Sequence, residues 1–121
     1  MRRSSVGDKA LEISIALEAL LSDGGSENTY KIGLRSALLL GGNPKDMVHV
    51  RAIIGGTYVL RSALVHNGEV GETVKIVDEE KKKSEDVVDE AIVICAKVIR
   101  RILELREIPN WYRFELLNKK F

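Results

Sequence analysis

A chain of 121 residues, 45% hydrophobic and 31% charged, has enough apolar residues for one folded domain and too many for a disordered segment. Its 19 lysines and arginines balance 18 aspartates and glutamates, so the net charge of +1 gives no overall attraction to nucleic acid. The single cysteine excludes a disulfide within the chain, and no apolar run or signal-peptide pattern indicates a membrane or an exported protein. We therefore expect one cytoplasmic domain over residues 1–121.

Two helices are predicted in the first third of the chain. The first covers residues 9–21 with Asp8 as its N-cap, and its apolar side chains surround almost the whole helix, which predicts burial on most sides. Glycines follow at 24–25, and a second helix is expected over residues 26–40 before the glycine pair at 41–42.

A long third helix is predicted from the N-cap pair Asn43-Pro44 to about His66. On a helical wheel its core-facing stripe contains Arg61, and a charge on such a stripe is costly unless it is paired or lines a cleft. We expect Glu18 of the first helix to pair with Arg61; the alternative is that the guanidinium reaches past the stripe to water. The apolar members of this stripe are Met47, Val50, Ile53, Ile54, Tyr58, Leu60, Leu64 and Val65.

The rest of the chain is predicted to contain a connection and two more helices. Residues 69–83 form the connection, with a short extended piece at Val74 and Ile76 and a solvated charged loop over 78–83. A fourth helix over 85–107 has one continuous apolar stripe, in which Cys95 is interpreted as core packing. A short helix over 110–119 is expected to dock through Trp111, Phe114 and Leu117. Together these elements predict an all-α bundle.

The third helix also carries the residues with the clearest chemical potential. Arg61 precedes His66 by five positions, just before Asn67-Gly68 ends the helix. Arginine can hold a phosphate with two hydrogen bonds, and histidine transfers protons near neutral pH. Together they form a minimal set for cleaving a phosphodiester without a metal. The alternative interpretation is that His66 only complements the helix dipole.

Geometry sets a condition on this site. Residues five apart are about 140° apart around a regular helix, so Arg61 and His66 do not converge by spacing alone. The helix must unwind before Asn67, or a twofold dimer must bring Arg61 of one subunit near His66 of the other. His66 shares its face with small residues, including Gly55 and Gly56, which cost helix stability unless another segment of this chain or of a second copy approaches closely.

Three segments resemble one protein family. The segment YVLRSALVHNG, which begins at Tyr58 and contains Arg61 and His66, resembles the R-x4-6-H signature of HEPN domains, closest to the Apea-like group. The segment IALEALL at 15–21 resembles the ALEALL helix of that group, and LRSALLLG at 34–41 resembles its arginine-containing second helix. The order and separations agree, and the resemblance covers about residues 8–120.

The resemblance implies a HEPN-like bundle of four main helices plus a short C-terminal helix, which forms a homodimer. Many members are metal-independent ribonucleases of toxin, abortive-infection and CRISPR systems, with their arginine and histidine in a cleft at the dimer interface. The expected function is therefore an endoribonuclease that needs no metal or other cofactor.

Residue by residue, the resemblance gives Arg61 the role of stabilising the phosphate and His66 that of acid or base. Ser62, Asn67 and Glu18 are the expected supporting residues. Active members often carry Asn, Asp or His directly after the arginine, where this chain has Ser62. Two other functions use the same residues: a non-catalytic RNA- or nucleotide-binding dimer, and the dimerisation module of a defence protein. An antitoxin is a further expected partner of a toxin.

Overall fold

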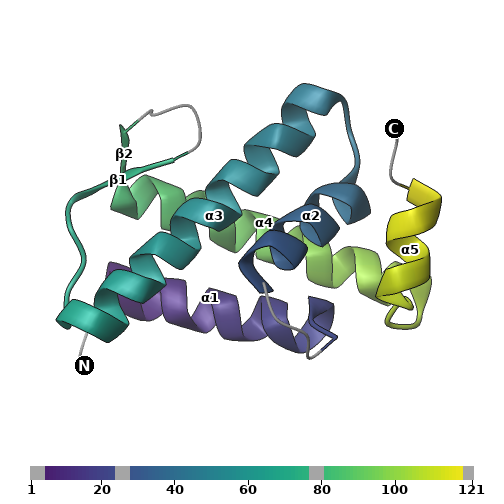
Figure 1. Cartoon of the computed structure of the whole chain (residues 1–121), viewed down its shortest axis with the longest axis horizontal. Helices are drawn as coiled ribbons and strands as arrows, with labels where there is room; N and C mark the ends of the chain where they lie inside the picture. The colour runs from purple at the N-terminus through teal and green to yellow at the C-terminus, as the bar shows by residue number, and fades with distance from the viewer. Residues whose placement is uncertain (1–4, 24–27, 77–80, 119–121) are drawn as a thin grey trace.

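The computed structural model describes residues 5–23, 28–76 and 81–118, and this part of the chain is an all-α helical bundle with one small hairpin (Figure 1). The predicted fold class is therefore confirmed. The elements are α1 (Val6–Leu21), α2 (Asn28–Leu40), α3 (Pro44–Asn67), β1 (Thr73–Lys75), β2 (Lys81–Lys83), α4 (Ser84–Leu105) and α5 (Trp111–Asn118).

Helix α3 is the centre of the bundle, because α1, α2 and α4 all pack against it (Figure 1). The short helix α5 lies at the far end of α4 and contacts α2. The apolar sides of the helices meet in a single core, whose largest fully buried apolar side chains are Leu17, Leu21, Ile32, Ile53, Ile54, Val87, Val88 and Val98. None of the described helices combines the length and the hydropathy needed to cross a membrane.

The first helix begins earlier than predicted, and its N-cap is Ser5 rather than Asp8. The Ser5 hydroxyl accepts from the backbone N–H of Asp8 at 3.0 Å, and the Asp8 carboxylate accepts from the Ser5 N–H at 3.3 Å. Asp8 is therefore the third residue of a capping box, in which each side chain satisfies the other residue's free N–H. The predicted Asn43 cap is confirmed, and Asn43 forms the same kind of box with Asp46.

Several predicted core residues are exposed. Ile15 on α1, Val65 on α3 and Leu117 on α5 each leave most of the side chain in contact with solvent. In each case no element of the described chain buries that side of the helix, so an apolar residue there stays exposed whatever its place in the sequence pattern. Cys95 is buried as predicted, and this burial raises the pKa of its thiol, which keeps it a poor nucleophile.

The predicted extended piece at Val74 and Ile76 is confirmed as one strand of a hairpin, but Lys81–Lys83 is its partner strand and not a loop. Val74 lies opposite Lys82 in antiparallel register, and Val74 and Ile76 both point into the core. These buried side chains hold β1 in place, and the three lysines of β2 pair along the outer edge of β1. Residues 78–80 of the predicted loop lie outside the described residues.

Gly56 lies where α3 meets Ile76 after β1 and Val87 of α4, and this contact requires a glycine. A Cβ there would lie 2.9 Å from Cγ2 of Ile76 and 3.3 Å from Cγ1 of Val87, so the hairpin and α4 occupy the space. The close approach that the sequence predicted is thus made within this chain. Gly55 faces open space, and nothing in the structure explains a glycine there.

Arg35 on α2 is the largest fully buried side chain, with 1% of it exposed. Its guanidinium donates to Oε1 of Glu115 at 2.6 Å, to the backbone oxygen of Leu21 at 2.5 Å and to Oδ2 of Asp23 at 3.0 Å. It also lies over the Trp111 ring, 5.5 Å from the centroid. The Arg35 guanidinium therefore links both the end of α1 and the helix α5 to α2.

Candidate functional site

The C-terminal part of α3 and the start of α2 line a small open pocket of about 300 Å³. Three of the predicted site residues, Arg61, Ser62 and His66, line it together. The remaining lining residues are Thr29, Tyr58 and Val65. Helix α3 stays regular to Asn67, which excludes unwinding before Asn67, one of the two alternatives that the sequence left open. Arg61 and His66 nevertheless line the same pocket of a single chain.

Arg61 is held by a carboxylate, as predicted. Its Nη1 lies 3.0 Å from Oε1 of Glu18, and the Tyr58 hydroxyl donates to the same oxygen at 3.2 Å. The guanidinium also lies over the Tyr58 ring, 5.7 Å from the centroid. The Arg61 side chain is 32% exposed, so it lies at the edge of the core stripe rather than inside it. A ligand can therefore reach the guanidinium without a rearrangement of the core.

Tyr58 supports this arrangement and does not act as a base. Burial, together with the negative charge of Glu18, raises the pKa of the Tyr58 hydroxyl well above its ordinary value. The hydroxyl therefore stays protonated and donates its hydrogen bond at every physiological pH. Sequence analysis did not assign Tyr58 or Thr29 to the site; the signal for Tyr58 was its place one turn before Arg61.

His66 is exposed in the last turn of α3 and has no hydrogen-bond or ion-pair partner among the described residues. Its ring is therefore free to meet a ligand in the pocket. The helix ends directly after it, where Gly68 adopts a left-handed conformation and donates its N–H to the Leu64 oxygen at 2.8 Å. Asn67 is exposed and does not line the pocket, so the structure places this predicted supporting residue outside the site.

The other histidine lies on the first half of α3. Nε2 of His49 is 3.3 Å from Oε1 of Glu90 on α4, and both side chains are largely exposed. No group of three potential metal ligands occurs within residues 5–23, 28–76 and 81–118.

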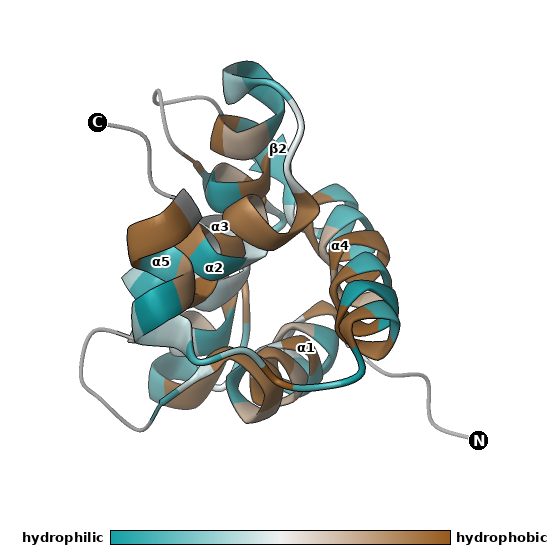
Figure 2. Cartoon of the chain, turned by 90° about the vertical axis from the view of Figure 1, so that its right-hand side faces the viewer, coloured by the Kyte–Doolittle hydropathy of each residue, from teal (hydrophilic) through white to brown (hydrophobic). Residues whose placement is uncertain are grey.

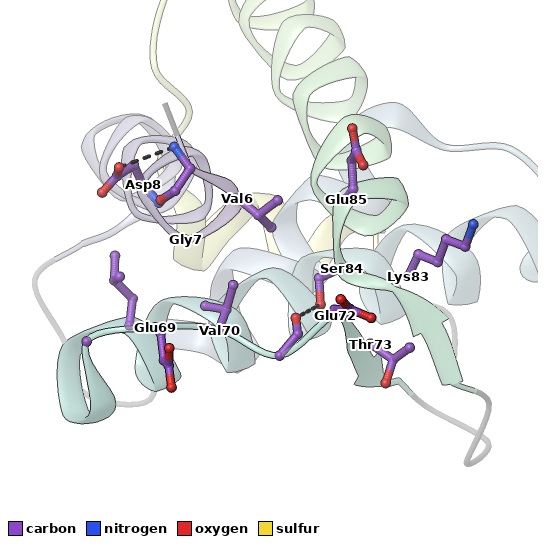
Figure 3. A pocket seen from close by; sticks show the side chains of 14 residues that line it. Val6, Gly7, Asp8, Glu69, Val70, Glu72, Thr73, Lys83, Ser84 and Glu85 are labelled. Atoms are coloured by element: carbon purple, nitrogen blue, oxygen red, sulfur yellow. Dashed lines mark hydrogen bonds between the residues drawn. The ribbon is translucent and has the colours of Figure 1, made fainter. Parts of the chain in front are cut away.

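A larger pocket of about 790 Å³ lies between the start of α1, the loop after α3 and the start of α4 (Figure 3). Figure 3 shows Val6 and Val70 directed towards each other across it, and the Lys83 side chain pointing away. Its charged lining residues are otherwise acidic: Asp8, Glu69, Glu72 and Glu85. Carboxylates at this density repel a phosphate, so the smaller pocket at Arg61 is the better candidate for an anionic ligand.

Comparison of the chain with family models, with curated proteins and with solved structures finds no match. The resemblance to HEPN domains therefore depends on the three sequence segments, and the case for a site depends on the residues around the pocket.

Proposed function

We propose that the chain is a metal-independent endoribonuclease whose active site is the pocket formed by Arg61, Ser62 and His66. The observation that supports this most directly is the shared pocket, since it places a phosphate-binding cation and an unpartnered histidine around one accessible space. The resemblance of the same residues to the HEPN signature points to the same chemistry. No metal ligand is needed for it.

In the proposed reaction, the ribose 2′-OH attacks the adjacent phosphorus and the bond to the 5′-oxygen of the next nucleotide breaks. His66 accepts the proton of the 2′-OH and returns a proton to the leaving 5′-oxygen. Arg61 stabilises the negative charge that develops on the non-bridging oxygens, and Ser62 donates a hydrogen bond to them. The products are a 2′,3′-cyclic phosphate and a free 5′-OH.

Glu18 has a positioning role in this proposal. It holds Arg61 at the pocket edge through a hydrogen bond that the Tyr58 hydroxyl reinforces on the same oxygen. Because the guanidinium has five N–H donors and its hydrogen bond to Glu18 uses only Nη1, its other donors can bind a phosphate while the ion pair stays intact.

An exposed tyrosine on α2 adds support for RNA as the ligand. Tyr30 follows Thr29 of the pocket wall, its ring is half exposed, and Arg51 of α3 covers it with 5.0 Å between guanidinium carbon and ring centroid. Unpaired RNA bases stack on tyrosine rings and arginine planes.

The second candidate function is RNA or nucleotide binding without cleavage, and the ion pair between Arg61 and Glu18 favours it. A carboxylate on the arginine reduces the positive charge that a transition state would meet. A role as the dimerisation module of a defence protein, and a complex with an antitoxin, remain further proposals from the resemblance.

Cleavage of single-stranded RNA by the purified chain in EDTA tests the first proposal. We expect cleavage by the unaltered chain, and none by His66→Ala or on RNA with deoxyribose at the cleaved position. His49→Ala is the matched control, because it removes the other exposed histidine of the same helix. Cleavage that survives His66→Ala, or that requires added Mg²⁺, contradicts the mechanism. RNA binding that depends on Arg61 and His66 without any cleavage supports the second candidate instead.

A further inference from the structure

The outer side of α4 carries an apolar stripe that the rest of the described chain leaves partly exposed. We define the α4 stripe as Ile92, Ala96, Ile99 and Leu103, which follow one another at spacings of four, three and four residues and so lie on one side of the helix. Ile92 is 43% exposed, Ile99 40% and Leu103 70%. Figure 2 shows α4 at one side of the bundle with no described element beyond it.

A charged residue continues the stripe at each end. Asp89 lies three residues before Ile92 within α4, and Arg106, the left-handed C-cap residue directly after the helix, lies three residues after Leu103. Both are exposed, and neither has an ion-pair partner within the described part of the chain. The stripe is therefore acidic at its start, apolar along its length and basic at its end.

From this order of charges we propose that a second copy of the chain packs on the α4 stripe with its own α4 antiparallel. The pattern repeats every seven residues, as in helices that pair along a narrow seam. In the antiparallel arrangement Ile92 meets Leu103 of the second copy and Ala96 meets its Ile99. Asp89 then meets Arg106 of the second copy at both ends of the contact, because the twofold axis repeats each pair.

Other alignments of the two helices are worse. A parallel pair would place Asp89 against its own equivalent and Arg106 against its own, so both ends would repel. If the antiparallel pair is shifted by seven residues in one direction, Asp89 of one copy lies against Ile99 of the other. If it is shifted by seven residues in the other direction, Ile92 has no partner on the second helix. Only the unshifted antiparallel alignment pairs every apolar residue with an apolar residue and every charge with its opposite. The small side chain of Ala96 lets the two helices approach closely at the centre.

This contact differs from the one that the sequence predicted through the small-residue face of α3. That face is used within the chain only in part, since Ala52 is buried and Gly56 packs on Ile76 and Val87, whereas Gly55 faces open space. The α4 stripe contains none of the residues around the Arg61 pocket. The proposed dimer therefore does not depend on the proposed ribonuclease activity, and either can fail without the other.

Sedimentation equilibrium of the full chain at micromolar concentration tests the proposal. We expect a dimer, and we expect Leu103→Glu to raise its dissociation constant by more than about tenfold, because the change puts a charge into both symmetric apolar contacts. Leu117→Glu is the matched control, since Leu117 is equally exposed on α5 but lies outside the stripe. Circular dichroism checks that both variants keep the helix content of the unaltered chain.

Charge exchange tests the direction of the pairing. Asp89→Arg alone and Arg106→Asp alone should each weaken the dimer, whereas the double variant should restore it, because the opposite charges then meet again. An unaltered chain that stays monomeric, a dimer that Leu103→Glu leaves unchanged, or a double variant no tighter than the single ones would each overturn the antiparallel α4 contact.

Discussion

Arg35 and Arg61 both form ion pairs with carboxylates, and their surroundings give them different tasks. Arg35 is enclosed by α1, α2 and α5, has three acceptors and is 1% exposed, so no ligand reaches it. Arg61 has one carboxylate partner and stays about one third exposed, so it keeps donors for a ligand. Burial, more than charge, therefore separates the structural arginine from the candidate functional one.

The stability of single-residue variants should reflect this difference. Arg35→Ala is expected to lower the free energy of unfolding by about 3 kcal/mol, because it leaves a cavity and separates two carboxylates from their cation. Arg61→Ala, at an exposed pair, should cost about 1 kcal/mol or less. Urea denaturation followed by circular dichroism measures both. Equal losses in the two variants would contradict the assigned roles.

At the scale of elements, the sequence predicts the helices well and their exposed sides less well. Asn43-Pro44 and Gly68 are local signals, and both ends of α3 agree with them. Burial depends on which element lies opposite. The helical wheel therefore placed Val65 in the core, although Val65 is exposed. It also did not show that Arg35 is buried as an ionic centre; Arg35 lies between Ile32 and Leu39 on one face of α2.

The candidate site shows the same division. Sequence analysis predicted the ion pair of Arg61 and Glu18, because a charge beside a core stripe needs a partner and the first helix offered one. It did not predict that one pocket joins Arg61 and His66 within a single chain, because the wall at Thr29 comes from the position of α2 against α3. That position is a property of the packed bundle.

The two adjacent glycines of α3 provide a test of the contact between α3 and the hairpin. Gly56→Ala should destabilise the chain by about 1–3 kcal/mol, since its Cβ would overlap Ile76. Gly55→Ala faces open space and should stabilise the helix by up to about 1 kcal/mol, because alanine favours helix more than glycine does. Thermal unfolding of the two variants measures the difference. A loss of stability in Gly55→Ala would show that this side of α3 is covered in solution.

On the scale of the whole molecule, the features described above lie on different parts of the bundle. The buried ionic centre joins α5 to α1 and α2, the candidate site lies between the end of α3 and the start of α2, and the α4 stripe lies along one outer side (Figures 1 and 2). A net charge of +1 means that RNA is attracted only where local cations are free.

This separation predicts that assembly and activity can be changed one at a time. Leu103→Glu, which removes the proposed dimer contact, should leave RNA cleavage or binding per chain within about twofold of the unaltered protein, because no α4 residue lines the pocket. Activity measured over a range of chain concentrations provides the comparison. If Leu103→Glu loses activity and regains it at chain concentrations that restore the dimer, the site instead needs both copies.

The contact between Arg35 and Glu115 also sets an order of events during synthesis. The two residues are 80 positions apart, so the ribosome makes most of the bundle before the second carboxylate of this buried cation exists. At about 5–20 residues per second, the interval is roughly 4–16 s. During that interval α2 carries a guanidinium that the finished core encloses, with no α5 to cover it. The bundle therefore closes late, and a nascent chain interrupted before residue 115 keeps this part of its core open to water and to proteases.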